Sequence, residues 1–281
     1  MFIADESGLH LIPCLLSQET QRDLLSRLMH GILADEKNKN NVQLHFRAPY
    51  HATRSEKHNG QLLQQTSPNG LSSRDTSFFN ISPKSTELLM PLNPNVHKPI
   101  TISQFLNRKL RWLTLGRQYD WTAKAYPVEE SPAFPQDIAA LIGSLFPAMR
   151  PEAAILNIYT PGDTLSVHRD VSEDSEKGLV SISIGCDALF VVGIGDEETN
   201  KLSYLTIRLR SGDAIYMSGP SRFAWHGVPK IIPDSCPQWL RHWPAHSSFE
   251  SSEDGLPSEY EAWRGWMSTK RVNLNVRQMN D

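Results

Sequence analysis

Short strand patterns follow one another in the second half of the chain, from residue 153 onward. The runs are AAILNIY, LVSISIG, ALFVVG, YLTIRLR, DAIYMS, AWHGV and RVNLNVR, with PGD, SGD and SGPS turns among them. Neighbouring parallel strands would need helices between them, and no helical pattern separates these runs. The sequence therefore predicts an antiparallel double-sheet jelly roll.

Two helical patterns come before the strands and make the expected fold class α+β, a jelly-roll core with flanking N-terminal helices. Residues 17 to 34, SQETQRDLLSRLMHGILA, repeat apolar residues at helical spacing after Ser17, which can serve as the N-cap. A second helix is expected over 136 to 146. Residues 51 to 103 are polar and aperiodic, which predicts a long loop region, and residues 231 to 263 read as a polar surface insertion.

Composition excludes several classes of protein. The 281 residues are 39% hydrophobic and 21% charged, and the net charge of −3 is not that of a globally basic nucleic-acid binder. Three scattered cysteines are too few for a disulfide framework. No apolar run approaches the roughly 20 residues that span a bilayer, so we expect no membrane association. Nucleus or cytoplasm is the expected location, and a mitochondrial one stays open if the N-terminus is truncated.

A histidine and an aspartate one residue apart are candidate metal ligands. His168 and Asp170 would share one face of an extended strand, with Cβ atoms roughly 6 to 7 Å apart. Among 10 histidines such a pair also arises easily by chance. His226 in SRFAWHGV could add the second histidine of the facial triad found in non-haem Fe(II) oxygenases. The alternative is a hydrogen-bonded histidine beside Trp225 with no ligand role.

The last strand pattern, RVNLNVR, alternates without interruption. Its polar face consists of Arg271, Asn273, Asn275 and Arg277. This face could be the wet side of an antiparallel sheet. If it instead points into a barrel, unpaired charge is costly and an anionic ligand is the natural partner. Because arginine binds carboxylates through two parallel hydrogen bonds, this strand is a candidate acid-binding site.

Taken in order, these segments resemble the catalytic core of the AlkB family of Fe(II)/2-oxoglutarate dioxygenases. The resemblance rests on AILNIYTPGDTLSVHRD, the serine-rich strand after it, SGDAIYMSGPSRFAWHGV and RVNLNVRQ, and it covers residues 108 to 279. LRWLTLGRQYDW and the long insertion before RVNLNVRQ resemble the eukaryotic AlkB homologue 1 branch. We therefore expect an N-terminal extension over 1–107 and a dioxygenase domain over 108–281, with a nucleotide-recognition segment at 108–135 and the insertion at 231–263.

The resemblance implies a double-stranded β-helix, two cofactors and specific residues. Fe(II) would be bound by His168, Asp170 and His226. The residues that match the 2-oxoglutarate contacts are Asn157, Tyr159, Arg271, Asn273 and Arg277. Arg271 would pair with the distal carboxylate and Arg277 would lie near the iron-chelating end. Strand geometry separates these two arginines by about 20 Å at Cα, so their side chains would have to converge to hold one small diacid.

The activity implied is oxidative demethylation of N-methylated bases in DNA or RNA, tRNA included, with release of formaldehyde, succinate and CO₂. A base in such a pocket needs aromatic side chains to stack on and cations for the backbone. The residues expected to bind substrate are Trp112, Tyr119, Trp121, Ser172 and Arg222. The bland alternative for RKLRWLTLGRQYDW is solvated arginines beside core aromatics.

Base preference stays open at this stage. Ser172 stands where some AlkB enzymes have an acidic residue, so 1-methyladenine, 3-methylcytosine and 6-methyladenine all remain candidates. The acidic run SEDSEK that begins there is expected to be a solvated turn between two strands.

Other functions remain as alternatives. Strand scission at abasic sites in DNA would need a lysine amine, for which Lys124, Lys177 and Lys201 are candidates. A protein-directed hydroxylase or demethylase could use the same fold, and so could a catalytically silent binding module. The expected partner is nucleic acid, and a monomer is favoured.

Overall fold

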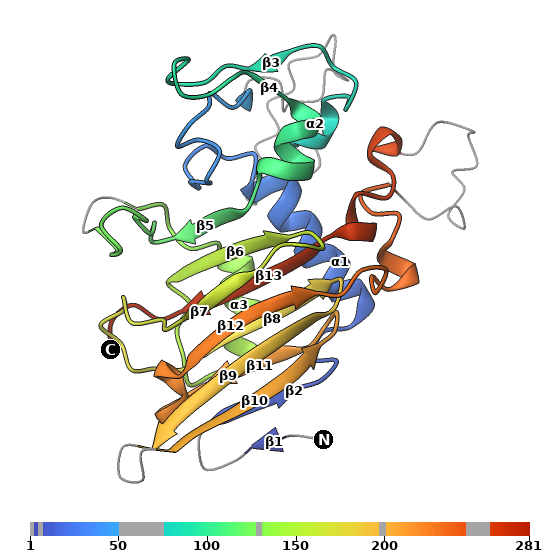
Figure 1. Cartoon of the computed structure of the whole chain (residues 1–281). Coiled ribbons are helices and arrows are strands. Elements are labelled where there is room, and N and C mark those ends of the chain that lie inside the picture. Colours follow the sequence, from blue (N-terminus) through green and yellow to red (C-terminus); the bar gives the residue numbers. More distant parts are fainter. Residues whose placement is uncertain (1–2, 5–7, 51–75, 128–130, 197–200, 246–258) are drawn as a thin grey trace.

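Two antiparallel sheets face each other in the protein (Figure 1). The structure is a computed structural model and describes residues 3–4, 8–50, 76–127, 131–196, 201–245 and 259–281. The major sheet has the strand order β1-β2-β11-β8-β13-β6-β5, and the minor sheet has the order β10-β9-β12-β7. This arrangement confirms the predicted jelly roll.

Most strands begin and end close to the residues that the alternation predicted. The major sheet contains β1 (Ile3–Ala4), β2 (Leu9–Ile12), β5 (Trp112–Gly116), β6 (Ala153–Tyr159), β8 (Leu179–Gly185), β11 (Ala214–Met217) and β13 (Arg271–Arg277). The minor sheet contains β7 (Leu165–His168), β9 (Ala188–Asp196), β10 (Lys201–Leu209) and β12 (Trp225–Ile231). A separate hairpin joins β3 (Leu88–Leu89) and β4 (Ile100–Thr101).

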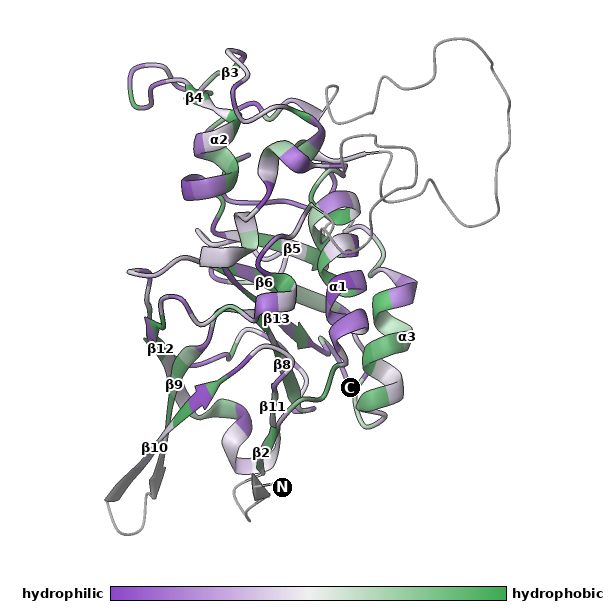
Figure 2. Ribbon diagram, turned by 90° about the vertical axis from the view of Figure 1, so that its right-hand side faces the viewer, coloured by the Kyte–Doolittle hydropathy of each residue, from purple (hydrophilic) through white to green (hydrophobic). Residues whose placement is uncertain are grey.

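Helices cover the side of the major sheet that faces away from the minor sheet, so the molecule has three layers (Figure 2). The helices of this layer are α1 (Gln18–Ser26), continued by the π-helix η1 (Arg27–Ile32), and α3 (Gln136–Leu145). Val272, Leu274 and Val276 of β13 belong to the buried core. The apolar face of β13 therefore packs away from the space between the sheets, and its polar face is left to line that space.

The predicted helix after Ser17 is confirmed. The Ser17 hydroxyl accepts a hydrogen bond from the Thr20 amide at 3.1 Å, which satisfies one of the free amides of the first turn. Leu24 and Leu28 are buried, as the helical spacing required. The last turns are wound as a π-helix rather than an α-helix, a difference that the apolar spacing does not show.

The expectation of one long loop over 51 to 103 holds only in part. Residues 51–75 lie outside the described residues, and residues 76–103 contain the 3-10 helix η3 (Phe78–Asn80) and the β3-β4 hairpin. Phe78 and Phe79 are fully buried, and Phe79 makes edge-to-face contacts with Trp243, Trp263 and Trp266. Two adjacent aromatics thus anchor a segment whose composition is otherwise polar.

The described part of the insertion at 231–263 packs onto the N-terminal helix. It contains the 3-10 helices η6 (Gln238–Leu240) and η7 (Glu261–Trp263). The Trp243 indole donates to the Ser26 hydroxyl at 3.2 Å, and Arg22 donates to the Trp239 carbonyl at 2.9 Å. The segment is therefore part of the helical layer over these residues, and not only a surface excursion.

Remaining short elements complete the described chain: α2 (Ile102–Gln104), η4 (Phe105–Lys109), η5 (Gly219–Phe223) and η8 (Trp266–Thr269). In the part of the chain that the structure describes, no helix combines the length and apolar character needed to cross a membrane.

Candidate active site

Two neighbouring strands of the minor sheet bring the candidate metal ligands together. His168 ends β7 and lies directly opposite His226 of β12, so both imidazoles point from the minor sheet toward the major sheet. Gly227 permits this close pairing, because a Cβ at its position would lie only 3.0 Å from the Leu165 carbonyl oxygen. Asp170 follows β7 by two residues. Sequence separation alone would leave His226 far from the other two ligands.

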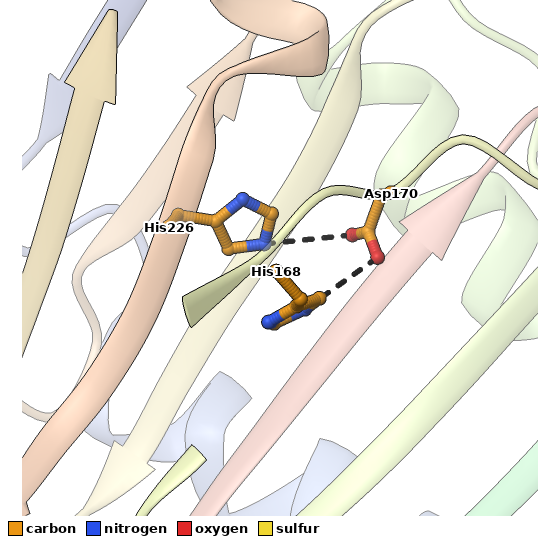
Figure 3. Close-up of side chains that lie close together, drawn as sticks. All are labelled: His168, Asp170 and His226. Carbon is orange, nitrogen blue, oxygen red and sulfur yellow. Dashed lines mark ion pairs between the residues drawn. The ribbon is translucent and has the colours of Figure 1, made fainter. Parts of the chain in front are cut away.

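The three side chains point toward one another (Figure 3). Each histidine Nε2 lies 3.7 Å from an Asp170 carboxylate oxygen, and the two ring centroids are 4.4 Å apart. All three ligand atoms lie within 4.8 Å of one another. Two imidazole nitrogens and one carboxylate, with the remaining coordination positions free, form the donor set of a non-haem Fe(II) facial triad.

Backbone carbonyls fix the orientation of both imidazoles. His168 Nδ1 lies 2.9 Å from the Ser166 carbonyl oxygen, and His226 Nδ1 lies 3.0 Å from that of Ala224. A carbonyl only accepts, so each Nδ1 carries the proton and each Nε2 keeps its lone pair for a metal. Burial lowers the pKa of His226, against the opposing effect of Asp170, which favours the neutral form that binds metal.

Two residues of β13 hold the third ligand. Arg277 Nη2 lies 2.9 Å from Asp170 Oδ2, and the Asn275 amide donates to the same oxygen at 3.3 Å. Burial acts to raise the pKa of Asp170, but nearby positive charge, that of Arg277 above all, outweighs it and the pKa is lowered. The carboxylate is therefore ionised and held in place before a metal binds.

The acidic run after Asp170 is the expected solvated turn only in part, because Asp174, Glu176 and Lys177 are exposed but Glu173 is not. Glu173 is fully buried and pairs with Arg222 at 2.9 Å and with Arg277 at 3.1 Å. Arg222 also donates to the backbone carbonyls of Asp170 and Lys177, each at 2.9 Å. Buried arginines neutralise this carboxylate and fix the segment that carries the ligand aspartate, which explains why Glu173 can lie inside.

Arg271, at the other end of β13, has a different environment. Its side chain is 1% exposed, and neither Nε nor Nη1 has a hydrogen-bond partner among the described residues. Burial lowers the pKa of Arg271 and raises that of its neighbour Tyr159 to about 12. A buried, incompletely paired guanidinium calls for an anion with two oxygens. The residues present thus fit the distal carboxylate of 2-oxoglutarate.

One cavity joins the triad to Arg271. Its volume is about 760 Å³. The cavity is lined by all five residues predicted to contact 2-oxoglutarate: Asn157, Tyr159, Arg271, Asn273 and Arg277. Asn273 donates to the Ser181 hydroxyl at 2.8 Å and to the Ile182 carbonyl at 3.1 Å. The separation of about 20 Å between the two arginines at Cα is therefore no obstacle to binding one diacid. Arg277 contacts the ligand Asp170 at one end of the cavity, and Arg271 lies at the other end, where the distal carboxylate fits.

Three of the five residues expected to bind substrate line the same cavity. They are Tyr119, Trp121 and Ser172. Tyr119 and Trp121 form a T-shaped pair with ring centroids 4.8 Å apart, and Trp121 is partly exposed. An aromatic wall therefore stands in the same cavity as the metal ligands.

Trp112 and Arg222 are not placed in the cavity lining. The Trp112 ring packs against Trp121 at 5.1 Å and supports it from behind. Arg222 is 1% exposed, and its guanidinium bonds to Glu173 and to backbone carbonyls. In this structure Arg222 holds the segment that carries Asp170 and does not line the cavity.

Two functional residues escaped the sequence reasoning. The Tyr126 hydroxyl accepts a hydrogen bond from Arg277 Nη1 at 2.8 Å across 151 residues of chain, and no local pattern announces such a contact. Asn275 was seen on the polar face of RVNLNVR but received no role. Its position directly between Asn273 and Arg277 on one strand face was the signal that could have assigned it to the site.

Three ligand atoms with free coordination positions, beside a carboxylate-binding arginine, are what Fe(II)/2-oxoglutarate-dependent dioxygenases require, and the double sheet is their fold. Residues 76–277 match the family model of the 2OG-Fe(II) oxygenase superfamily. The chain belongs to this superfamily and, within it, to the AlkB homologue 1 branch of dioxygenases. Fe(II) and 2-oxoglutarate are accordingly its cofactors.

Relatives and one solved structure support that assignment. The N6-methyladenosine RNA demethylase ALKB1 of Pyricularia oryzae is 45% identical over 98% of this chain and 75% of its own length. The N6-methyladenosine RNA demethylase ALKBH of Cryphonectria parasitica is 52% identical, over 73% of this chain and 91% of its own. The tRNA demethylase abh1 of Schizosaccharomyces pombe is 36% identical, over 97% and 79%.

The solved structure of OsALKBH1 has the same fold. It superimposes with a TM-score of 0.55 at 18% identity and covers 99% of this chain and 100% of its own. At that identity the likeness concerns the fold alone.

Proposed function

We propose that this dioxygenase removes methyl groups from N-methylated bases in RNA, with N6-methyladenosine as its substrate. The observation that carries the proposal is the single cavity of about 760 Å³, which holds the triad, Arg271 and the Tyr119–Trp121 wall together. It has room for 2-oxoglutarate and a flipped base at once. The printed names of the three relatives describe demethylases that act on RNA or tRNA.

The side chains divide the work between binding and positioning. Arg271 and Tyr159 hold the distal carboxylate of 2-oxoglutarate, and His168, Asp170 and His226 hold Fe(II). The bound iron supplies the oxidation of the methyl group, coupled to conversion of 2-oxoglutarate and O₂ into succinate and CO₂. Arg277 keeps Asp170 ionised throughout.

The base is placed by the aromatic wall. Tyr119 and Trp121 offer ring faces and edges at the cavity mouth, where a base taken out of its stack can pack. The hydroxymethyl group formed on nitrogen then loses formaldehyde and leaves the free amine. That last step needs only a proton returned to nitrogen, which water can supply.

Charge near the base favours a neutral substrate. 1-Methyladenine and 3-methylcytosine are cationic, whereas N6-methyladenine is neutral. Ser172 lines the cavity and is uncharged, and the Glu173 carboxylate is turned inward onto Arg222 and Arg277. No carboxylate in this part of the segment is thus offered to a cationic base, which supports N6-methyladenine over the other two.

A mass-spectrometric assay of nucleosides tests the proposal. Purified protein is incubated with Fe(II), ascorbate, 2-oxoglutarate and single-stranded RNA containing one methylated base, and the RNA is then digested. We expect loss of N6-methyladenosine with equimolar formaldehyde, faster than loss of 1-methyladenosine or 3-methylcytidine. His168→Ala should abolish the reaction, and Leu92→Ala, at an exposed position, should not.

Two outcomes would contradict the proposal. If succinate accumulates while every methylated nucleoside persists, and a methylated peptide declines instead, the enzyme acts on protein. If His168→Ala retains strand scission at abasic sites with no succinate formed, the Schiff-base alternative is favoured.

A further inference from the structure

The outer face of the minor sheet carries exposed aromatic side chains that the catalytic site does not use. This face is turned toward the viewer in Figure 1. Tyr204 of β10 is 77% exposed and Trp225 of β12 is 51% exposed. Tyr204 is the most exposed large hydrophobic side chain among the described residues. Singly exposed apolar residues need no explanation, but the placement of these two is not random.

Strand register puts both aromatics in one row. Tyr204 pairs with Gly193 of β9, and Gly193 pairs on its other side with Trp225. Directly paired residues of antiparallel strands point to the same face. His226 pairs with His168, the last residue of β7, so Arg169 follows the strand end next to Trp225. The row across the sheet therefore reads Tyr204, Gly193, Trp225, with Arg169 beside Trp225.

The glycine creates a slot between the two rings. Tyr204 and Trp225 are two strands apart, which is about 10 Å at the strand spacing of 4.7 to 4.9 Å. Gly193 places no side chain between them. Aromatic rings stack with centroids about 4.5 Å or more apart. One ring that stacks on Tyr204 on one side and on Trp225 on the other would therefore fill a spacing of about 10 Å. Two side chains that stand up from the sheet at this spacing leave room for one planar ring between them.

Arg169 connects this row to the active site. It lines the catalytic cavity, and its guanidinium carbon lies 5.9 Å from the centroid of the Trp225 ring. Its Nε donates to the Phe223 carbonyl at 2.7 Å, which holds the side chain over that ring. A cation between the cavity and the slot is placed to contact the phosphate that joins two neighbouring nucleotides.

We propose that Tyr204 and Trp225 hold one unpaired base of the RNA substrate between them, a nucleotide or two from the base in the cavity, with Arg169 on the phosphate between. The inference rests on the proposed function, because it requires the substrate to be nucleic acid. It also requires that the RNA have an unpaired nucleotide close to the methylated base for tight binding. Exposed aromatics on a sheet face, with a cation nearby, are the usual means of binding unpaired bases.

Binding of a fluorescently labelled single-stranded RNA tests the slot. Stacking on one aromatic is worth enough for Tyr204→Ala and Trp225→Ala each to raise the Kd roughly tenfold. Trp225→Phe, which keeps a ring, should restore most of the affinity. Leu92→Ala removes a comparably exposed apolar side chain outside the minor sheet and should bind as the unaltered protein does.

An abasic substitution in the RNA identifies the base in the slot. Each nucleotide flanking the N6-methyladenosine is replaced in turn by an abasic residue. At one flanking position the loss of affinity should match that of Tyr204→Ala, and the two changes together should cost no more than one alone. At the other flanking positions, the losses of binding free energy caused by the abasic residue and by Tyr204→Ala should add.

The outcomes separate this inference from the proposed function. If the unaltered protein demethylates RNA while Tyr204→Ala and Trp225→Ala bind it equally well, the slot is refuted and the proposed function stands. If the protein converts 2-oxoglutarate but neither binds nor demethylates nucleic acid, both fail. If the two variants instead lose a bound protein partner without any change in RNA affinity, the surface serves that partner and the slot is refuted.

Discussion

Replacing Arg271 by methionine should weaken 2-oxoglutarate binding and, at the same time, leave the ligand-free protein at least as stable as before. The two effects have opposite signs because of the environment of this side chain. Its guanidinium is 1% exposed and has two nitrogens without hydrogen-bond partners among the described residues. The guanidinium is therefore available to bind a ligand, and its burial without a partner lowers the stability of the ligand-free protein.

The magnitudes follow from this environment. Two charge-assisted hydrogen bonds to a carboxylate are worth about 1.5–3 kcal/mol each, so losing both should weaken 2-oxoglutarate binding roughly 100- to 10,000-fold. Replacing a buried ion by an apolar side chain of similar volume is neutral or stabilising by about 1–4 kcal/mol. Arg271→Met should therefore unfold at the same temperature as the unaltered protein or higher, in the absence of ligand.

Thermal unfolding with and without 2-oxoglutarate measures both effects, with Mn(II) in place of Fe(II) so that no turnover occurs. The unaltered protein should be stabilised by the cosubstrate and Arg271→Met should not. Arg27→Met is the matched control, because Arg27 and its partner Asp137 are 38% and 54% exposed, and the loss should stay within about 1 kcal/mol. If Arg271→Met unfolds much earlier without ligand and still binds 2-oxoglutarate normally, Arg271 is a structural cation and the reasoning is wrong.

Three further predictions concern the surrounding groups. Asp170→Ala should lower the affinity for Mn(II), measured by calorimetry, by more than the 10- to 100-fold typical of outer-shell changes, because a direct ligand is lost. Arg222→Met should lower the unfolding free energy in urea by about 3–5 kcal/mol, because Glu173 loses one of its two buried partners; unchanged stability with lost RNA binding would instead favour a substrate contact. Lys270→Met should raise the unfolding free energy at pH 7 by about 1–2 kcal/mol, because burial lowers the pKa of Lys270 from 10.5 to about 8, and the lost hydrogen bond to the Asn107 carbonyl offsets part of that gain. That gain should vanish as the pH rises from about 8 to 10.5, where the amine becomes neutral in the folded and then in the unfolded chain, and a pH series of denaturation curves checks it.

The strands were predictable because short apolar or alternating runs follow one another between turn signals. RVNLNVR alternates over its full length, AAILNIY places Asn157 and Tyr159 on one face, and the structure pairs the two strands in register along all seven positions. A shift of one residue would turn Arg271 and Asn157 into the helical layer, so the pattern leaves a single register. The triad was predictable from the order of its motifs, HxD followed by His226, and from their resemblance to the AlkB family. The expected strand ends at His168, and Asp170 lies just beyond it.

Other parts of the fold depend on long-range packing that a local pattern does not contain. β2 was not expected, yet it pairs with β11 in the major sheet. Glu173 was expected in solvent because it belongs to the acidic run SEDSEK. Its neighbours Asp174 and Glu176 are indeed exposed, but η5 and β13 place two arginines against Glu173 and bury it. A buried ion pair between segments distant in sequence leaves no local trace.

The two arginines of RVNLNVR show most clearly why local sequence underdetermines the site. Both lie on the same strand face and both are buried, so the pattern treats them as equivalent. Asp170 and Glu173 supply two negative charges, and Arg277 and Arg222 supply two positive charges that pair with them. This end of the cavity is therefore balanced within the protein before any metal arrives. No carboxylate pairs with Arg271 among the described residues, so its charge must be matched by the ligand, and the ligand must carry a carboxylate remote from the atoms that chelate the metal. Selection of a diacid such as 2-oxoglutarate thus follows from how the carboxylates are distributed around β13, and not from the arginines themselves.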